Sequence, residues 1–128
     1  MKYLILLLLL AGCSKSSVSP SDITGNWQFS STRVSGDFSI AKVGTDYKTT
    51  AGSTFTIDGV SYTAVDTSIP SVANGSTVIT LQTAIVSGQA HGITFNAQIA
   101  PDWKSMKATN VRINTNTPIT DTFTVNRK

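Results

Sequence analysis

The chain has 128 residues and a formal net charge of +3, and only 13% of its residues are charged. Glutamate is absent, while serine and threonine are abundant, a composition that favours strands and turns over long helices. It excludes coiled coils, helical bundles and collagen-like fibres, and its scattered basic residues exclude the positive stripe of a nucleic-acid-binding surface.

The first 13 residues have the order of a secretory leader. Met1-Lys2 gives a positive start, and Tyr3–Leu10 is an unbroken apolar run. Such a run suits a signal-peptide core and is too short to span a bilayer, which takes about 20 residues. The run ends in Leu10-Ala11-Gly12-Cys13, which resembles the lipobox of bacterial lipoprotein precursors. This resemblance implies that residues 1–12 are a signal peptide, cut just before Cys13, and that Cys13 is acylated.

Residues 13–22 are expected to form a serine-rich tether. The segment Ser14–Ser21 has almost no apolar side chain to bury, and a coil of about nine residues spans roughly 15–18 Å. Ser14 is not the aspartate that marks inner-membrane retention in the Gram-negative sorting rule. We therefore expect a protein anchored to the outer membrane and facing the periplasm, with the lipid bilayer as the partner of acylated Cys13 and no nucleic acid as a partner.

Residues 23–128 are expected to form one all-β domain. Apolar and polar side chains alternate along most of this stretch with the period of a half-buried strand. The expected strands cover 23–30, 36–43, 47–57, a segment from Val60, 77–86, 93–99, 105–113 and 119–127.

The strongest short-range signal in the domain is Asp58-Gly59, which predicts a two-residue β-hairpin. Such a loop pairs Ile57 with Val60 and Phe55 with Tyr62. Both pairs place apolar side chains on one face, so the turn and the hydrophobic pattern predict the same register.

Other irregularities are expected at turns and bulges. Gly52 predicts a kink or bulge in the long strand 47–57, and 66–75 is expected to be irregular. Ser87-Gly88 and Pro101-Asp102 predict turns. The apolar parity slips in 105–113, and a β-bulge near Thr109-Asn110 would restore a common face.

Sequential antiparallel strands that each have one apolar face can bury that face in two common arrangements. One is an eight-stranded up-and-down β-barrel, and the alternative is a two-sheet β-sandwich. Connections in this chain are mostly short, as a meander requires, and a barrel leaves no sheet edge exposed. We therefore predict the barrel.

The two ends of the domain carry a second resemblance. Ile23-Thr24-Gly25-Asn26-Trp27 resembles the Gly-x-Trp opening of the lipocalin and avidin group of barrels. In that group a basic residue near the last strand packs over the tryptophan, which implies this role for Arg127. In a closed meander the first and last strands meet, so Arg127 can reach the face of Trp27 in a cation–π contact worth about 0.5–2 kcal/mol. Gly25, Trp27 and Arg127 are therefore expected to close the barrel.

No catalytic, metal or cofactor site is expected. His91, the single histidine, has no local nucleophile or orienting partner. The aspartates are scattered, and Cys13 is the single cysteine, so no metal-ligand spacing is present. Asp121-Thr122-Phe123-Thr124 is similar to a stretch of bacterial avidins whose aspartate helps to bind biotin. Trp27 and Trp103 are too few to wall a biotin pocket, so Asp121 is expected to be a surface or strand-end residue.

Three function classes follow, and the sequence indicates no ligand-binding residue or protein partner for any of them. The first is binding of a small apolar ligand inside a lipocalin-like barrel. The alternative is a cell-envelope interaction module or protease-inhibitor-like barrel without a ligand cavity. An enzyme is the third class, and we do not expect one. The first class depends on small side chains expected on the inner face, namely Thr49, Ala51, Ser53, Ala64, Thr83 and Ala97.

Overall fold

The computed structural model describes residues 22–70, 72, 75–114 and 116–128. Cys13, the expected signal peptide and most of the expected tether lie outside the described residues. Within the described part of the chain there is no helix, and so none long and apolar enough to cross a membrane. The strands are β2 (Gly25–Ser30), β3 (Val34–Val43), β4 (Asp46–Thr49), β5 (Thr54–Ile57), β6 (Val60–Thr63), β7 (Thr67–Ile69), β8 (Ser76–Gln82), β9 (Gly92–Ile99), β10 (Ser105–Ile113), β11 (Thr117–Pro118) and β12 (Phe123–Arg127).

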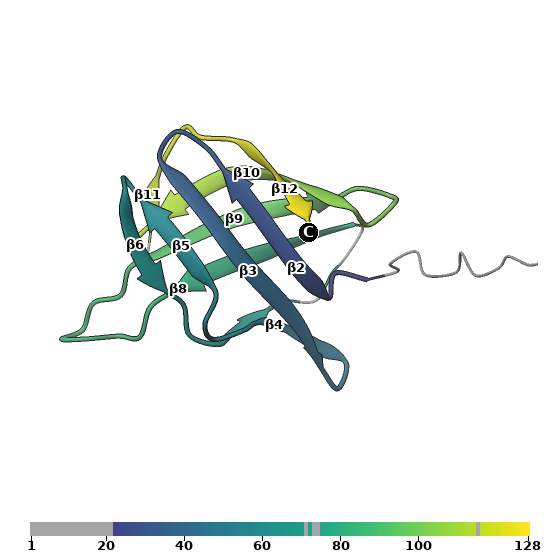
Figure 1. The fold of residues 1–128 in the computed structure, drawn as a ribbon, viewed down its shortest axis with the longest axis horizontal. Helices are drawn as coiled ribbons and strands as arrows, with labels where there is room; N and C mark the ends of the chain where they lie inside the picture. Colours follow the sequence, from purple (N-terminus) through teal and green to yellow (C-terminus); the bar gives the residue numbers. More distant parts are fainter. Residues whose placement is uncertain (1–21, 71, 73–74, 115) are drawn as a thin grey trace, which may run out of the picture.

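The strands form one antiparallel sheet that curls into an open barrel (Figure 1). Eight of them are paired in the order β6-β5-β3-β2-β12-β10-β9-β8. This is the order of an up-and-down meander whose last strand, β12, lies beside its first, β2. The predicted antiparallel barrel is confirmed in this open form, and the alternative two-sheet sandwich is not formed.

Two local predictions are confirmed in detail. Asp58 and Gly59 have φ angles of 49° and 85°, as a type I′ hairpin turn requires, and Phe55 lies opposite Tyr62 in the predicted register. The β9–β10 register shifts between Thr109 and Arg112, which is the predicted bulge. The shift allows both halves of β10 to direct apolar side chains into the core.

Other strand limits differ from those expected. The long strand 47–57 divides at Gly52 (φ 92°) into β4 and β5, which pair with opposite halves of β3. The stretch 66–75 contains β7, which pairs with β4. β8 ends at Gln82, and β12 begins only at Phe123. In each case the tertiary pairing partner sets the limit, and this partner is not visible in the local pattern.

The barrel does not close into a continuous ladder between β6 and β8, a gap that we call the seam. The edge of β8 is partly covered across the seam, since the Val65 N–H donates to the Gln82 carbonyl over 2.9 Å. The Thr49 hydroxyl donates to the Thr80 carbonyl over 3.0 Å. The outer edge of β6 pairs with no other described strand. The prediction that the barrel leaves no sheet edge exposed is therefore wrong at the seam.

The barrel has two distinct ends. The described chain begins at Asp22, which lies with the 100–104 turn and the C-terminus at one end, here called the tether end. The turns at 31–33 and 58–59, the 83–91 hairpin, Asn114 and residues 116–122 lie at the other, distal end. Figure 1 shows the 83–91 hairpin reaching outward on the side opposite to the start of the described chain.

Candidate interaction site at the open edge of the barrel

Aromatic side chains fill the interior of the barrel. The rings of Phe29 and Phe123 stack with centroids 4.5 Å apart and planes at 10°. Phe95 meets Phe29 edge-on at 5.6 Å, and Phe38 meets it at 6.1 Å. Gly36 makes room for this cluster, because a Cβ atom there would lie 2.4 Å from Cε1 of Phe29.

The small side chains expected on the inner face are only partly there. Thr49, Ser53, Ala64 and Ala97 are buried, as expected, whereas Ala51 is exposed in the kink between β4 and β5 and Thr83 is half-buried. The buried small side chains pack against the larger apolar residues of one continuous core.

At the tether end, Arg127 lies over Trp27, the position that the Gly-x-Trp resemblance implies for it. The two residues are paired across β12 and β2, and the guanidinium carbon lies 4.3 Å from the centroid of the indole ring. Arg127 also donates hydrogen bonds to three main-chain carbonyls: to Trp103 over 2.9 Å, to Asp22 over 2.6 Å, and to Thr24. Burial lowers the pKa of Arg127 from its ordinary value, and the nearby Asp22 carboxylate opposes this shift.

Gly25 is required by this arrangement for two reasons. Its φ angle of 128° is unfavourable for other residues, and a Cβ atom there would lie 2.7 Å from Nη1 of Arg127. The indole N–H of Trp27 donates to the Ile23 carbonyl over 2.9 Å, so the ring is fixed from both sides. Gly25, Trp27 and Arg127 thus form a structural contact between the ends of the chain.

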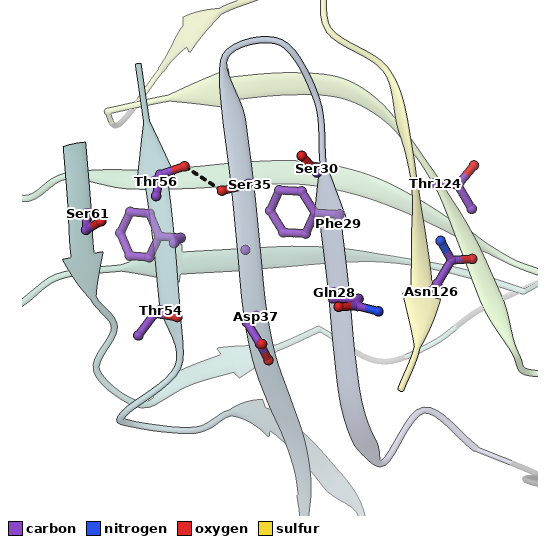
Figure 2. Close-up of a pocket in the computed structure, with 12 residues that line it drawn as sticks. Gln28, Phe29, Ser30, Ser35, Asp37, Thr54, Thr56, Ser61, Thr124 and Asn126 are labelled. Carbon is purple, nitrogen blue, oxygen red and sulfur yellow. Dashed lines mark hydrogen bonds between the residues drawn. The ribbon is translucent and has the colours of Figure 1, made fainter. Parts of the chain in front are cut away.

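The outer face of the sheet carries a hollow of about 460 Å³, lined mostly by polar side chains, with Phe29 and Phe55 also in its lining (Figure 2). Ser61, Thr56, Ser35, Ser30 and Thr124 lie in a row across β6, β5, β3, β2 and β12. Their hydroxyl groups are neutral, and those of Ser35 and Thr56 bond each other over 2.5 Å.

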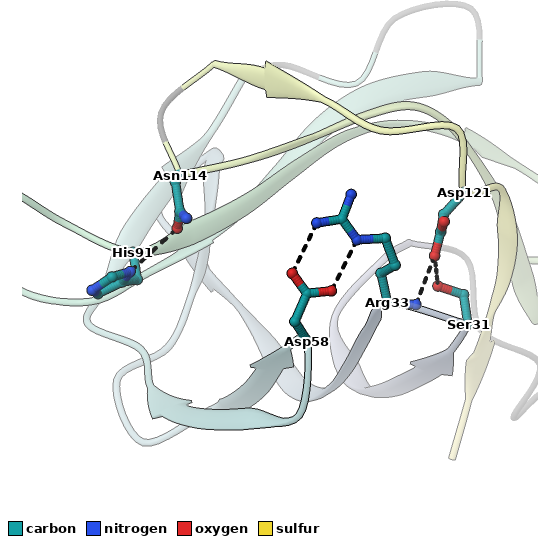
Figure 3. Close-up of polar contacts among 6 residues, drawn as sticks. All are labelled: Ser31, Arg33, Asp58, His91, Asn114 and Asp121. Atoms are coloured by element: carbon teal, nitrogen blue, oxygen red, sulfur yellow. Dashed lines mark hydrogen bonds and ion pairs between the residues drawn. The ribbon is translucent and has the colours of Figure 1, made fainter.

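Polar contacts connect the turns of the distal end (Figure 3). The Asp121 carboxylate accepts from the Ser31 hydroxyl over 2.6 Å and from the Arg33 N–H over 2.9 Å. These bonds, the hydroxyl first, lower the pKa of Asp121 below its ordinary value. Arg33 in turn donates hydrogen bonds from Nε and Nη2 to the Asp58 carboxylate. Asp121, just before β12, therefore holds the turn between β2 and β3, and its place is the one expected for a strand-end residue.

His91 lies beside the seam, where it contacts Tyr62 and Asn114. Its ring stacks on Tyr62 of β6 at 4.7 Å, and its Nδ1 lies 3.3 Å from the Asn114 side-chain oxygen. Among the described residues no group of three or more histidine, cysteine or acidic side chains could hold a metal ion. Through these two contacts His91 connects Tyr62 of β6 with Asn114 at the distal end of the barrel.

The free edge of β6 presents unpaired main-chain groups. A two-residue hairpin closes with a hydrogen-bonded pair, here Ile57 and Val60, and such pairs alternate with non-bonded pairs along an antiparallel ladder. The N–H and C=O groups of Ser61 and Thr63 therefore point away from β5. No described main-chain group bonds to them across this edge.

A projecting hairpin, residues 83–91, stands beside this edge. It turns at Ser87-Gly88, with φ angles of 54° and 76°, and Val86 and Gln89 exchange two main-chain hydrogen bonds. The predicted turn is confirmed, but the expected strand 77–86 does not continue into the hairpin, where Ile85 and Val86 are 71% and 69% exposed. Between this hairpin and the end of β6 lies a hollow of about 490 Å³ that includes Ala64, Val65 and Val86 in its lining.

No protein-family model, no curated protein and no solved structure matches the chain. The resemblances to lipoprotein precursors and to the lipocalin and avidin group therefore rest on the residues quoted for them.

Sequence reasoning missed the free edge of β6 and the exposure of the 83–91 hairpin. A signal for the hairpin was present, since Ile85 and Val86 are adjacent and a strand cannot direct both toward one face. No signal in the sequence shows that β6 and β8 fail to pair, because this depends on how the sheet curls.

Proposed function

We propose that the protein is a lipid-anchored module of the bacterial cell envelope that binds another protein through the distal end of its barrel. The filled interior is the observation that carries this proposal. A ligand pocket takes about 300 Å³ or more, and the space in which an apolar ligand would lie is occupied by the rings of Phe29, Phe38, Phe95 and Phe123. Of these four rings, Phe29 alone belongs to the lining of the outer hollow, and none belongs to the lining of the hollow beside the 83–91 hairpin.

The position of the proposed anchor supports the distal end as the binding surface. The chain that leads from Cys13 enters the described domain at Asp22, beside Arg127. An acyl group at Cys13 holds the tether end toward the bilayer. The distal end, with its exposed Ile85 and Val86, then faces away from it.

Replacing Cys13→Ser tests the anchor. The variant is expected to fold, because Cys13 precedes the domain, and to move from the membrane fraction to the soluble fraction. The matched control is Ser14→Ala, which leaves the acylation site intact and should stay with membranes. A Cys13→Ser protein that still sediments with membranes after a salt wash would show that acylation is not the anchor.

Photo-crosslinking in intact cells tests the binding surface. A photoreactive residue at Thr32 or Ser87 of the distal end is expected to capture a protein, whereas one at Asp102 of the tether end is not. Capture from Asp102 alone, or from none of the three, would contradict the proposal. Retention of a lipid-sized molecule, seen by native mass spectrometry after mild extraction, would instead support the carrier function.

A further inference from the structure

The free edge of β6 is built differently from the other open edge of the sheet. β8 has part of its edge covered by Val65 and Thr49. β6 has no such cover and carries no proline or charged residue, the features by which proteins commonly protect exposed edges. Its sequence is Val60-Ser61-Tyr62-Thr63, and the outward main-chain groups of Ser61 and Thr63 offer two donors and two acceptors.

The strand is also held in an extended conformation before anything binds. The type I′ turn fixes one end, and the Val65–Gln82 hydrogen bond fixes the chain just beyond the other end. Tyr62 is stacked between Phe55, at 5.4 Å, and His91, at 4.7 Å. A preorganised edge requires little further ordering of its own when a second strand pairs with it.

The hollow beside β6 indicates which side chains a strand paired with β6 would have. Its lining includes Ala64, Val65, Ala84 and Val86 and holds no acidic or basic side chain apart from His91. An uncharged segment with an apolar side chain fits this hollow, whereas a charged side chain would lose hydration there without an ionic partner. Main-chain pairing along Ser61 and Thr63 would bring the next residues of the segment into the hollow.

A second copy of the chain is a poorer occupant. Pairing of one β6 edge with another involves four residues from each copy. Stable protein–protein interfaces bury about 1,200–2,000 Å² in total, which is more than two such short strands supply. A flexible segment can pair with the edge and also follow the hollow and the exposed side chains of Ile85 and Val86. The described chain begins at Asp22, at the opposite end of the barrel, so an anchor that precedes Asp22 would leave this edge accessible.

We infer that β6 is a docking edge that accepts an extended, uncharged segment of a partner protein as an additional antiparallel strand, with an apolar side chain in the hollow beside the 83–91 hairpin. This inference rests on the proposed function, because it names the surface and the kind of segment through which the module would bind. It is an instance of β-strand addition, in which main-chain hydrogen bonds supply affinity and side-chain pockets supply specificity.

The test uses a capped hexapeptide of alternating valine and threonine, N-methylated along one edge so that the peptide cannot form sheets with itself. Titration into the ¹⁵N-labelled protein is expected to shift the amide resonances of Ser61 and Thr63 and to slow their hydrogen exchange. A peptide that is N-methylated along both edges is the control and should produce no shift.

Two pairs of variants separate main-chain pairing from side-chain contact. Ser61→Pro and Thr63→Pro remove the outward N–H and should weaken peptide binding about tenfold or more. Ser61→Ala and Thr63→Ala keep the N–H and should bind within about twofold of the parent. Proline is tolerated on edge strands, and should a proline variant misfold, the two methylated peptides make the same comparison on the unaltered protein.

Three outcomes would overturn the inference. The first is equal binding of the peptide that is N-methylated along one edge and the peptide that is N-methylated along both. The second is a set of resonance shifts confined to Thr124 and the other residues of the outer hollow. The third is a concentration-dependent dimer that Ser61→Pro abolishes, which would show that a second copy of the chain binds this edge. Crosslinks from Thr32 or Ser87 without peptide binding at β6 would leave the proposed function standing and refute only the docking edge.

Discussion

Arg127 stabilises the contact between β2 and β12 through the shape of its guanidinium group as much as through its charge. One planar group covers the Trp27 ring and donates to the carbonyls of Asp22, Thr24 and Trp103. Asp22 and Thr24 directly precede β2, Trp103 lies in the turn between β9 and β10, and Arg127 itself ends β12, so this one side chain connects all three places. Lysine has the same charge but cannot reproduce this fork of donors.

A double-mutant cycle on Trp27 and Arg127 measures this contact. Trp27→Ala should cost about 3–5 kcal/mol of unfolding free energy as a large core truncation. Arg127→Ala should cost about 1–3 kcal/mol, because it loses the ring contact and leaves carbonyls without donors. The two losses should fall short of additivity by about 0.5–2 kcal/mol in urea unfolding.

Arg127→Lys is the matched variant in this series and should lose most of what Arg127→Ala loses. Strict additivity of Trp27→Ala and Arg127→Ala would mean that the ring contact contributes nothing to stability. Full stability of Arg127→Lys would mean the same of the fork of donors.

At the scale of elements, the turns of the distal end are held by carboxylates, and this predicts a dependence on pH. The folded-state pKa of Asp121 is lowered, chiefly by the Ser31 hydroxyl and then by the Arg33 N–H. A lowered folded pKa contributes stability above the unfolded pKa of about 3.9, and this stability is lost as pH falls through the folded pKa. Asp121→Asn should therefore reduce stability near neutrality and flatten its loss below about pH 4.

Thermal unfolding between neutrality and acid pH checks this prediction. Asp46→Asn, at an exposed position in β4, is the control and should leave the acid profile of the parent unchanged. An Asp121→Asn variant with the same acid profile as the parent would show that Asp121 does not stabilise the turn.

Sequence reasoning was strongest for elements whose causes are local. The Asp58-Gly59 turn fixed the register of β5 and β6, and the parity slip in β10 located the bulge. It was weakest where one strand has two partners, as β3 has in β4 and β5. β7 was missed because its few residues become a strand only through pairing with β4.

For the whole molecule, the contact between the two ends of the domain could be expected from a meander, but the state of the seam could not. The twist and curl of the complete sheet determine whether β6 meets β8, and no short segment encodes them. The candidate interaction site lies at this unpredicted place. Buried positions, by contrast, mostly followed from alternation along the strands.

The buried Thr49 hydroxyl provides a test of how the seam is held. It contacts the carbonyls of Thr80 at 3.0 Å and Thr67 at 3.3 Å, and so connects β4 with β8 and β7. Thr49→Val keeps the shape of the side chain but leaves the two partly buried carbonyl groups without this donor, which should cost about 1–3 kcal/mol. Hydrogen exchange should accelerate in β7 and in β8, while β10 and β12 keep their protection.

Thr80→Val, which removes a half-buried hydroxyl bonded only to that of Thr94 among the described residues, is the control. Equal protection of β7 and β8 in Thr49→Val and in the parent would mean that other contacts hold the seam.

The pairing of β2 with β12 governs when this protein can fold. Arg127 and the Thr24 carbonyl that it binds are 103 positions apart in the chain, and the ladder between them lies in the middle of the sheet. Until the last strand has been synthesised, β2 and β10 each lack a neighbour, and the growing chain has no complete core. Such non-local pairing makes folding slow and exposes strand edges for longer. During this delay the incomplete sheet leaves apolar side chains and strand edges exposed, and the chain needs protection from aggregation.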